Sequence, residues 1–267
     1  ESGGRPHDTK GRSRPRLRPP RPLTRAAGLP PGDSLREPCN PGAFRNHSLQ
    51  DEALTTGPPR GPALVYPIDT QGGFDVQLDL PLHDENTAPE GSRRGLEATR
   101  QRLGFLPNVL RLLSNSPAAF KSYQTLTQQF EASSLTTTER HVVLLTASRE
   151  NGCDYCVAAH SVIADNAGAP AEVVDAIRDR RPIDDPKLEA LSRFTVRMVD
   201  TRGWVEQKDV DAFLEAGFTE PQVLDVLLGI TMKTLSNYAN HLEHTPLDEP
   251  FQGRAYEGAA AARAAGS

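Results

Sequence analysis

From Gly91 onward the chain repeats one pattern, in which a helix-start signal precedes an apolar stretch with helical spacing and a stop signal follows it. Ser116 and Pro117 are a typical N-cap and first-turn pair, and Thr136 and Glu139 have capping-box spacing. No segment indicates a sheet, so we predict an all-α fold. The expected helices are 92–105, 106–115, 117–133, 138–150, 153–168, 170–179, 186–203, 206–217 and 220–244.

The domain organisation follows from where the large apolar side chains lie. Residues 1–62 are rich in Pro, Gly and Arg and hold few such side chains, so we expect a disordered extension there. Residues 63–252 are expected to form one helical domain. Residues 253–267, which are mostly Ala, Gly and Arg, are expected to be a flexible tail.

Charge and hydropathy exclude several classes of protein. The net charge is -5, which does not favour nucleic acid as the main partner, although Gly11–Arg25 carries a local cluster of Arg and Pro. No apolar run is long enough to span a bilayer, and no apolar segment of a secretory signal is visible. We therefore expect a cytoplasmic protein without a membrane partner.

The feature with most chemical content is the stretch "ENGCDYCVAAHS". Cys153, Cys156 and His160 are spaced three and four residues apart, which places them within an arc of about 60° on a helix. The Asn151-Gly152 break puts Cys153 at a helix start, where the helix dipole favours a thiolate. His160 can take a proton from Cys156, and Glu150 can orient His160 or relay the proton.

Three other interpretations of the cluster remain open at this point. The cysteines can be small buried side chains beside a core histidine. They can be zinc ligands, for which His241 and His244 are the only other clustered histidines. A thioredoxin-type pair is a third interpretation, but that motif follows a strand, and both flanks here are helical. Cys39 lies in a loop-like stretch, and we expect no role for it.

The motif resembles the signature of the alkylhydroperoxidase D-like, carboxymuconolactone decarboxylase superfamily. "GFLPNVLRLLSNSPAAFKSY", "LTTTERHVVLLTASRENGC" and "NYANHLEHTPLD" support the resemblance, which covers about residues 80–251. It implies an all-α homo-oligomer and an antioxidant thiol peroxidase without cofactor or metal. It also implies that Cys156 attacks the hydroperoxide and that Cys153 then forms a disulfide, which an external dithiol protein or small thiol reduces.

The chain departs from the family pattern at one position. In the best-known members the relay glutamate lies twelve residues before the first cysteine, and His141 occupies that position here. Glu139 is two residues off register and has the spacing of a capping-box residue, so we expect Glu150 to replace the relay glutamate. The predicted catalytic set is therefore Cys156, Cys153, His160 and Glu150.

Two alternative functions accompany the peroxidase hypothesis. The family also contains carboxymuconolactone decarboxylases, which work without the cysteine pair. A protein of another class, a non-catalytic redox sensor, would form the disulfide and change its assembly without turnover.

Overall fold

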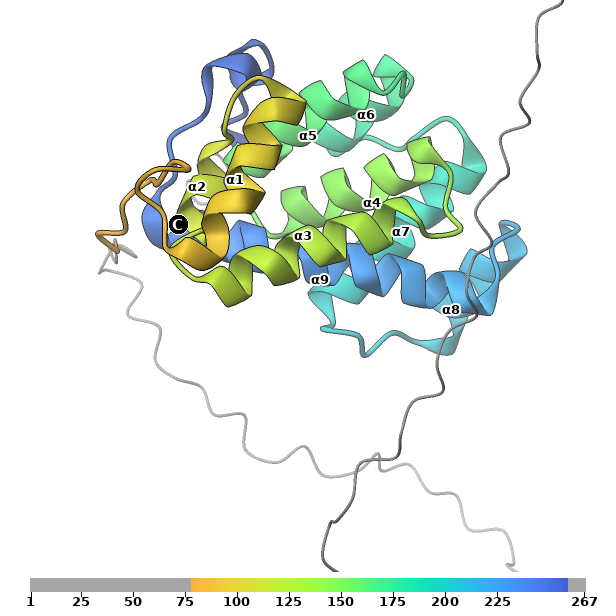
Figure 1. Cartoon of the computed structure of the whole chain (residues 1–267). Coiled ribbons are helices and arrows are strands. Elements are labelled where there is room, and N and C mark those ends of the chain that lie inside the picture. The colour runs from red at the N-terminus through yellow and green to blue at the C-terminus, as the bar shows by residue number, and fades with distance from the viewer. Residues whose placement is uncertain (1–77, 259–267) are drawn as a thin grey trace, which may run out of the picture. The chain divides into compact units, whose positions relative to one another are not determined.

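The computed structural model describes residues 78–258, which fold into a helical bundle (Figure 1). The predicted extension 1–62 and Cys39 lie outside these residues. The helices are α1 (Glu90–Leu103), α2 (Asn108–Leu113), α3 (Pro117–Glu131), α4 (Thr137–Glu150), α5 (Asp154–Asn166), α6 (Ala171–Arg178), α7 (Pro186–Asp200), α8 (Gln207–Glu215), α9 (Glu220–Glu243) and the 3-10 helix η1 (Glu249–Arg254). Within the described residues there is no strand, as predicted.

The predicted helix signals act at the ends of these helices. Ser116 caps α3 by accepting a hydrogen bond from the Ala119 amide, and Thr136 and Glu139 form both bonds of a capping box on α4. Gly104 ends α1 in the left-handed conformation, with φ of 79°. That conformation costs glycine little, because glycine has no Cβ.

Helix α4 lies at the centre of the bundle and packs against α5, α6, α7 and α9. All of its residues from Val142 to Arg149 are buried. An apolar run this wide covers more than one face of a helix, so its burial requires neighbours on several sides. The main core consists of Val142 to Leu145 of α4 and of apolar side chains from α3 and from α5 to α9. It includes Phe194, Phe213 and Phe218, whose rings stack.

A second apolar cluster lies among α1, α2, the first half of α3, the start of α5 and η1. It includes Leu96, Phe120 and Phe251, and both cysteines of the motif belong to it. Tyr123 of α3 packs against both clusters. The cysteine motif is therefore inside the fold, where two packed groups of helices meet.

Helix α9 passes close to α3 and α4 at Gly229. A Cβ atom at this position would lie 2.8 Å from Phe130 and 2.8 Å from Val143, both of which are buried. The absence of a side chain therefore sets how closely α9 approaches the centre of the bundle.

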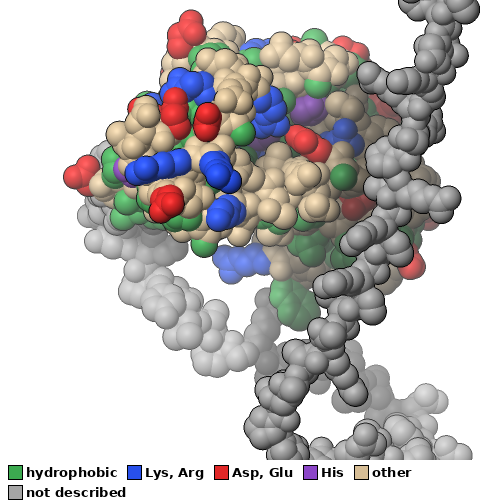
Figure 2. All heavy atoms as spheres, in the orientation of Figure 1, with side chains coloured by type: hydrophobic (Ala, Val, Ile, Leu, Met, Phe, Trp, Pro, Cys, Tyr) green, Lys and Arg blue, Asp and Glu red, His purple; other side chains and the backbone are tan. Residues whose placement is uncertain are grey.

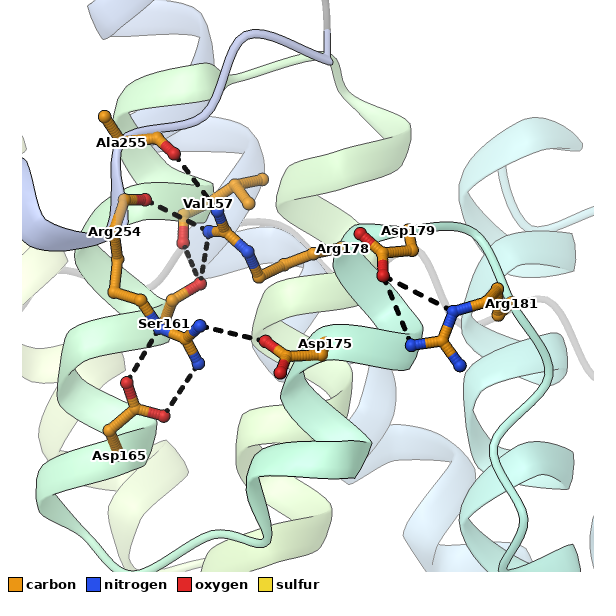
Figure 3. A network of polar contacts seen from close by, with 9 residues as sticks. All are labelled: Val157, Ser161, Asp165, Asp175, Arg178, Asp179, Arg181, Arg254 and Ala255. Carbon is orange, nitrogen blue, oxygen red and sulfur yellow. Dashed lines mark hydrogen bonds and ion pairs between the residues drawn. The ribbon is translucent and has the colours of Figure 1, made fainter.

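The predicted tail, 253–267, starts inside η1, and its first residues are packed rather than free. Arg254 forms ion pairs with Asp165 of α5 and Asp175 of α6 (Figure 3). Arg178 donates hydrogen bonds to the carbonyls of Arg254 and Ala255. The first residues of the predicted tail therefore contact α5 and α6, and the domain boundary at residue 252 stays a prediction. Residues 259–267 lie outside the described part.

The described surface is mixed in charge. On the face shown in Figure 2, Lys and Arg side chains alternate with Asp and Glu side chains. Between residues 78 and 258, no helix is both long and apolar enough to cross a membrane.

Candidate functional site

The cysteine pair lies at the N-terminus of α5. Gly152 has φ of 68° and lets the chain turn sharply out of α4, and the Cys153 amide donates to the Ser148 carbonyl at 2.9 Å. Cys153 is the N-cap of α5, so Cys156 lies in the first turn of the helix. Amides without intrahelical partners and the positive end of the helix dipole therefore surround Cys156.

Both sulfur atoms are buried and share one amide donor. Cys153 and Cys156 are free thiols that are each 2% exposed. The Asn240 Nδ2 atom donates to the Cys156 sulfur at 3.3 Å and approaches the Cys153 sulfur at 3.8 Å. The Cys153 thiol itself hydrogen-bonds to Cys156. The pair is thus arranged to hold one proton and one negative charge.

Lys233 supplies the matching positive charge. It comes from the middle of α9, is 1% exposed, and hydrogen-bonds to Cys156. Its Nζ atom also lies 2.8 Å from Nε2 of His160. Burial alone lowers the pKa of Lys233, but Cys156, Tyr123 and Cys153 together raise it above its ordinary value.

The two cysteines titrate in opposite directions. Burial raises the pKa of Cys156, but the hydrogen bond from Cys153 and the charge of Lys233 outweigh burial and hold that pKa well below its usual range. The pKa of Cys153 is raised, first by its hydrogen bond to Cys156 and then by burial. Cys156 is therefore the thiolate at neutral pH, and Cys153 is the thiol.

His160 is neutral in this arrangement. Burial, and then the charge of Lys233, hold the pKa of the imidazole well below its usual value. Its Nε2 atom faces the ammonium, which makes Nε2 the acceptor and leaves the proton on Nδ1. That Nδ1 atom is buried and has no hydrogen-bond partner among the described residues.

Two more side chains complete the surroundings of the thiolate. Tyr123 hydrogen-bonds to Ser236 of α9, and burial raises the pKa of its phenol. Asn237 lies next to Cys156 and helps to lower its pKa, and its Oδ1 accepts a hydrogen bond from Asn151 at 2.9 Å.

Of the four predicted catalytic residues, the structure brings together Cys153, Cys156 and His160, but not Glu150. The Glu150 carboxylate pairs with Arg149 and Arg180 and makes no hydrogen bond with His160. Glu150 is the last residue of α4, where the buried guanidinium of Arg149 needs a counter-ion. The described contacts therefore do not join Glu150 to His160, and the relay role of Glu150 stays a prediction.

The other two relay candidates have different surroundings. Glu139 closes the capping box of α4, as expected, and pairs with Lys187 at 2.8 Å. His141 lies near enough to His160 to affect it electrostatically, and its own Nδ1 atom is buried with no hydrogen-bond partner between residues 78 and 258. His141 is therefore the candidate that lies near the site.

The sequence analysis missed Lys233, Ser236, Asn237 and Asn240. These residues follow one another at spacings of three, one and three, so they form a single stripe on α9. The available signal was this polar stripe, because the rest of the helix is strongly apolar and a buried polar face indicates a site. It was overlooked because a buried lysine is rare unless it is paired.

The zinc interpretation lacks a ligand set in the described residues. No group of three or more His, Cys, Asp or Glu side chains there is arranged to hold a metal ion. The buried ammonium of Lys233 lies beside His160 and Cys156, and its charge repels a cation.

Fold and site together define an all-α protein with a buried, charge-paired dithiol. The model of the carboxymuconolactone decarboxylase family matches residues 116–197, which include both cysteines and His160. A search of curated protein sequences finds no relative. Residues 116–197 are thus similar to the carboxymuconolactone decarboxylase family, and the described domain has the fold of alkylhydroperoxidase D-like proteins.

Solved structures of low sequence identity share the fold. A peroxidase-related protein from Ralstonia eutropha JMP134, described as an alkylhydroperoxidase core, has a TM-score of 0.59 and 23% identity over 66% of this chain and 96% of its own. A peroxidase-related protein from Silicibacter sp. TM1040 has a TM-score of 0.58 and 19% identity, over 70% and 98%. The debrominase Bmp8 in complex with 2,3,4-tribromopyrrole has a TM-score of 0.56 and 18% identity, over 67% and 95%.

Proposed function

We propose that the protein is a cofactor-independent thiol peroxidase that reduces hydroperoxides. The observation that carries this proposal is the pairing of a Cys156 thiolate with the buried ammonium of Lys233, beside the protonated thiol of Cys153. A stabilised thiolate next to a second thiol is the arrangement that a two-cysteine peroxidase requires.

The reaction has three steps. The Cys156 thiolate attacks the terminal oxygen of the hydroperoxide, the O–O bond breaks, and Cys156 becomes a sulfenic acid while the alcohol leaves. The Cys153 sulfur then attacks the Cys156 sulfur and expels water, which forms the disulfide. An external dithiol reduces this disulfide by exchange and returns both cysteines to the starting state.

The opposite pKa shifts fix the order of these steps. The hydrogen bond to the Cys156 thiolate is the main cause that raises the pKa of Cys153 and keeps it protonated. Once Cys156 is a sulfenic acid, that cause has gone, so Cys153 loses its proton more readily and attacks. Cys153 therefore acts as a nucleophile only after Cys156 has been oxidised.

We propose the same partners as the sequence analysis predicts, namely a hydroperoxide, an external dithiol reductant and further copies of this chain. The two sulfurs are almost completely buried, which favours small hydroperoxides. We also propose a cytoplasmic location and an antioxidant role, because a reducing compartment maintains free cysteines and supplies the dithiol.

A peroxide-consumption assay tests the proposal. The wild-type protein, with dithiothreitol as reductant, is expected to consume hydrogen peroxide or tert-butyl hydroperoxide catalytically, and Cys156→Ser is expected to abolish turnover. Cys153→Ser should still undergo one oxidation of Cys156, which stops at the sulfenic acid. Wild-type consumption at the uncatalysed rate would refute the peroxidase.

The same assay separates the alternatives. A redox sensor would be oxidised once without turnover. A lactone decarboxylase would retain its activity after loss of both cysteines. Because the debrominase Bmp8 shares the fold, 2,3,4-tribromopyrrole serves as a further test substrate. If this substrate is turned over faster than any hydroperoxide, debromination becomes the favoured activity and the peroxidase proposal is rejected.

A further inference from the structure

The charge of Lys233 depends on the oxidation state of the cysteines. Its ammonium is 1% exposed, and no carboxylate within residues 78–258 forms an ion pair with it. The negative charge that it faces is the Cys156 thiolate. A disulfide removes this charge. An unpaired buried ammonium is unfavourable, because burial penalises the charged form of an amine.

The proton that Lys233 would lose is needed in the reaction. Cleavage of the O–O bond produces an alkoxide or hydroxide, which is a poor leaving group unless a proton reaches it. The site offers few donors, because His160 is neutral and faces the ammonium through the acceptor Nε2, and Cys153 is held by its bond to Cys156. Lys233 hydrogen-bonds to the sulfur that attacks.

We propose that Lys233 donates its proton to the leaving oxygen of the peroxide and stays a neutral amine while the cysteines form the disulfide. This role rests on the proposed peroxidase function. It makes Lys233 the general acid of the reaction, in place of the relay through Glu150 that the sequence suggests. It also keeps the buried site electrically neutral in both oxidation states.

The step balances without a further reactant. Thiolate, thiol, ammonium and hydroperoxide are converted to disulfide, amine, alcohol and water. Cys156 and Cys153 together lose two electrons, which the O–O bond takes up. One proton of the products comes from Lys233 and one from Cys153. When a dithiol reduces the disulfide, its two protons restore the Cys153 thiol and the Lys233 ammonium.

The groups that face Lys233 come from three helices. Cys156 and His160 lie on α5, Cys153 is its N-cap, and Tyr123 lies on α3. His141 of α4 acts only through His160. Apart from Cys156, these groups are neutral when the Cys156 charge is lost, so none of them replaces that charge.

Proton stoichiometry tests the proposal on the wild-type protein without any mutation. Fully reduced protein in weakly buffered solution near neutral pH is oxidised with diamide, whose reduction takes up two protons, and an indicator dye reports the protons exchanged. Ultraviolet thiolate absorbance verifies the starting state. We expect no net proton uptake, because Lys233 and Cys153 supply both protons. Uptake of one proton per disulfide, or no thiolate absorbance at the start, would overturn the proposal.

A charge-conserving variant tests the catalytic step. Lys233→Arg keeps a positive charge for the thiolate, but a guanidinium does not give up its proton. We expect this variant to take up one proton per disulfide and to react with tert-butyl hydroperoxide roughly 100-fold or more slowly. With peracetic acid, whose leaving carboxylate needs no proton, the slowing should be far smaller. Equal slowing with both oxidants would refute the role as general acid.

Two controls distinguish the proposed role of Lys233 from the proposed peroxidase function. Lys208→Arg, on the exposed surface of α8, should behave as the wild type. Because diamide oxidises a dithiol without peroxide chemistry, the stoichiometry can be measured even if no hydroperoxide is turned over. If no hydroperoxide is turned over but no net proton is taken up with diamide, the peroxidase function is refuted. The loss of the Lys233 proton on disulfide formation is then still supported.

Discussion

At the scale of single residues, the site depends on one buried lysine. Cys153, Cys156 and His160 would form an apolar helix interface if nothing charged faced them, and burial would then keep both cysteines protonated. Lys233 reverses this effect for Cys156, because an opposite charge inside the protein is screened much less than one in water. The reactivity of the pair is therefore a property of α9 as much as of the motif.

The pH dependence of thiol alkylation tests this effect. Iodoacetamide reacts with the thiolate, so its rate falls when pH drops below the pKa of the cysteine. Because the pKa of Cys156 is lowered, we expect the midpoint of the alkylation rate against pH to lie well below the value of about 8.5 for a free thiol. The measurement covers the pH range in which the protein stays folded. Lys233→Met should move the midpoint upward by at least one unit. A wild-type midpoint at or above the free-thiol value would contradict the thiolate assignment.

Glu150 offers a second test at this scale. Because its carboxylate pairs with Arg149 and Arg180, Glu150→Gln should leave peroxide turnover within about twofold of the wild type while lowering the free energy of unfolding by roughly 1–3 kcal/mol. Urea unfolding and the peroxidase assay measure the two effects. Glu131→Gln, at the exposed end of α3, is the matched control. A large loss of turnover at unchanged stability would restore Glu150 to the catalytic set.

At the scale of elements, α9 buries several polar side chains and exposes several large apolar ones. Lys233, Asn237 and Asn240 point into the protein, whereas Leu224 and Tyr238 are 67% and 54% exposed. A surface helix normally buries its apolar stripe and exposes its polar residues. The buried polar residues of α9 form part of the site. We propose that another copy of the chain covers the exposed apolar residues.

The close approach of α9 at Gly229 leads to a stability prediction. Gly229→Ala gains helix propensity of about 1 kcal/mol, but its Cβ would overlap Phe130 and Val143, and overpacking costs about 1–3 kcal/mol. We expect net destabilisation, which urea unfolding can detect. Thr231→Ala on the exposed side of the same helix is the control and should be neutral or slightly stabilising. A more stable Gly229→Ala variant would show that the helices can separate without cost.

At the scale of the whole molecule, the site lies where two core clusters meet, and the end of the chain holds part of this region in place. Arg254 joins α5 to α6 through Asp165 and Asp175 (Figure 3). The 3-10 helix η1 packs Phe251 against Tyr155. Contacts with the C-terminal segment therefore hold α5 in place. They fix the position of the cysteines relative to Lys233.

We predict that the whole molecule self-associates. The exposed apolar stripe of α9 includes Leu224, Leu227, Tyr238 and Leu242. We expect analytical ultracentrifugation to show a homo-oligomer, and the double variant Leu224→Glu, Tyr238→Glu to dissociate it, because burying each such side chain contributes about 1.5–3 kcal/mol. Leu103→Glu, an exposed change on α1, should have no effect. Unchanged assembly of the double variant would place the contact elsewhere.

The sequence by itself determined the helices, their caps and the motif. These features are local: an N-cap at Ser116, a capping box at Thr136 and the three-and-four spacing of Cys153, Cys156 and His160 each depend on residues within one or two turns. Local hydrogen bonding and helical periodicity do not require knowledge of distant contacts, so these predictions agree with the structure.

Only the tertiary structure decided which charges meet at the site. Glu150 is next to the motif in sequence, but two arginines hold it away from His160, whereas Lys233 is distant in sequence and lies against both His160 and Cys156. The reason is physical: electrostatic partners are selected by the packing of α4, α5 and α9 around a buried site, and that packing depends on side chains spread along the whole domain. The spacing of the motif marks the two candidate thiols, and the fold places Lys233 where its charge stabilises the Cys156 thiolate.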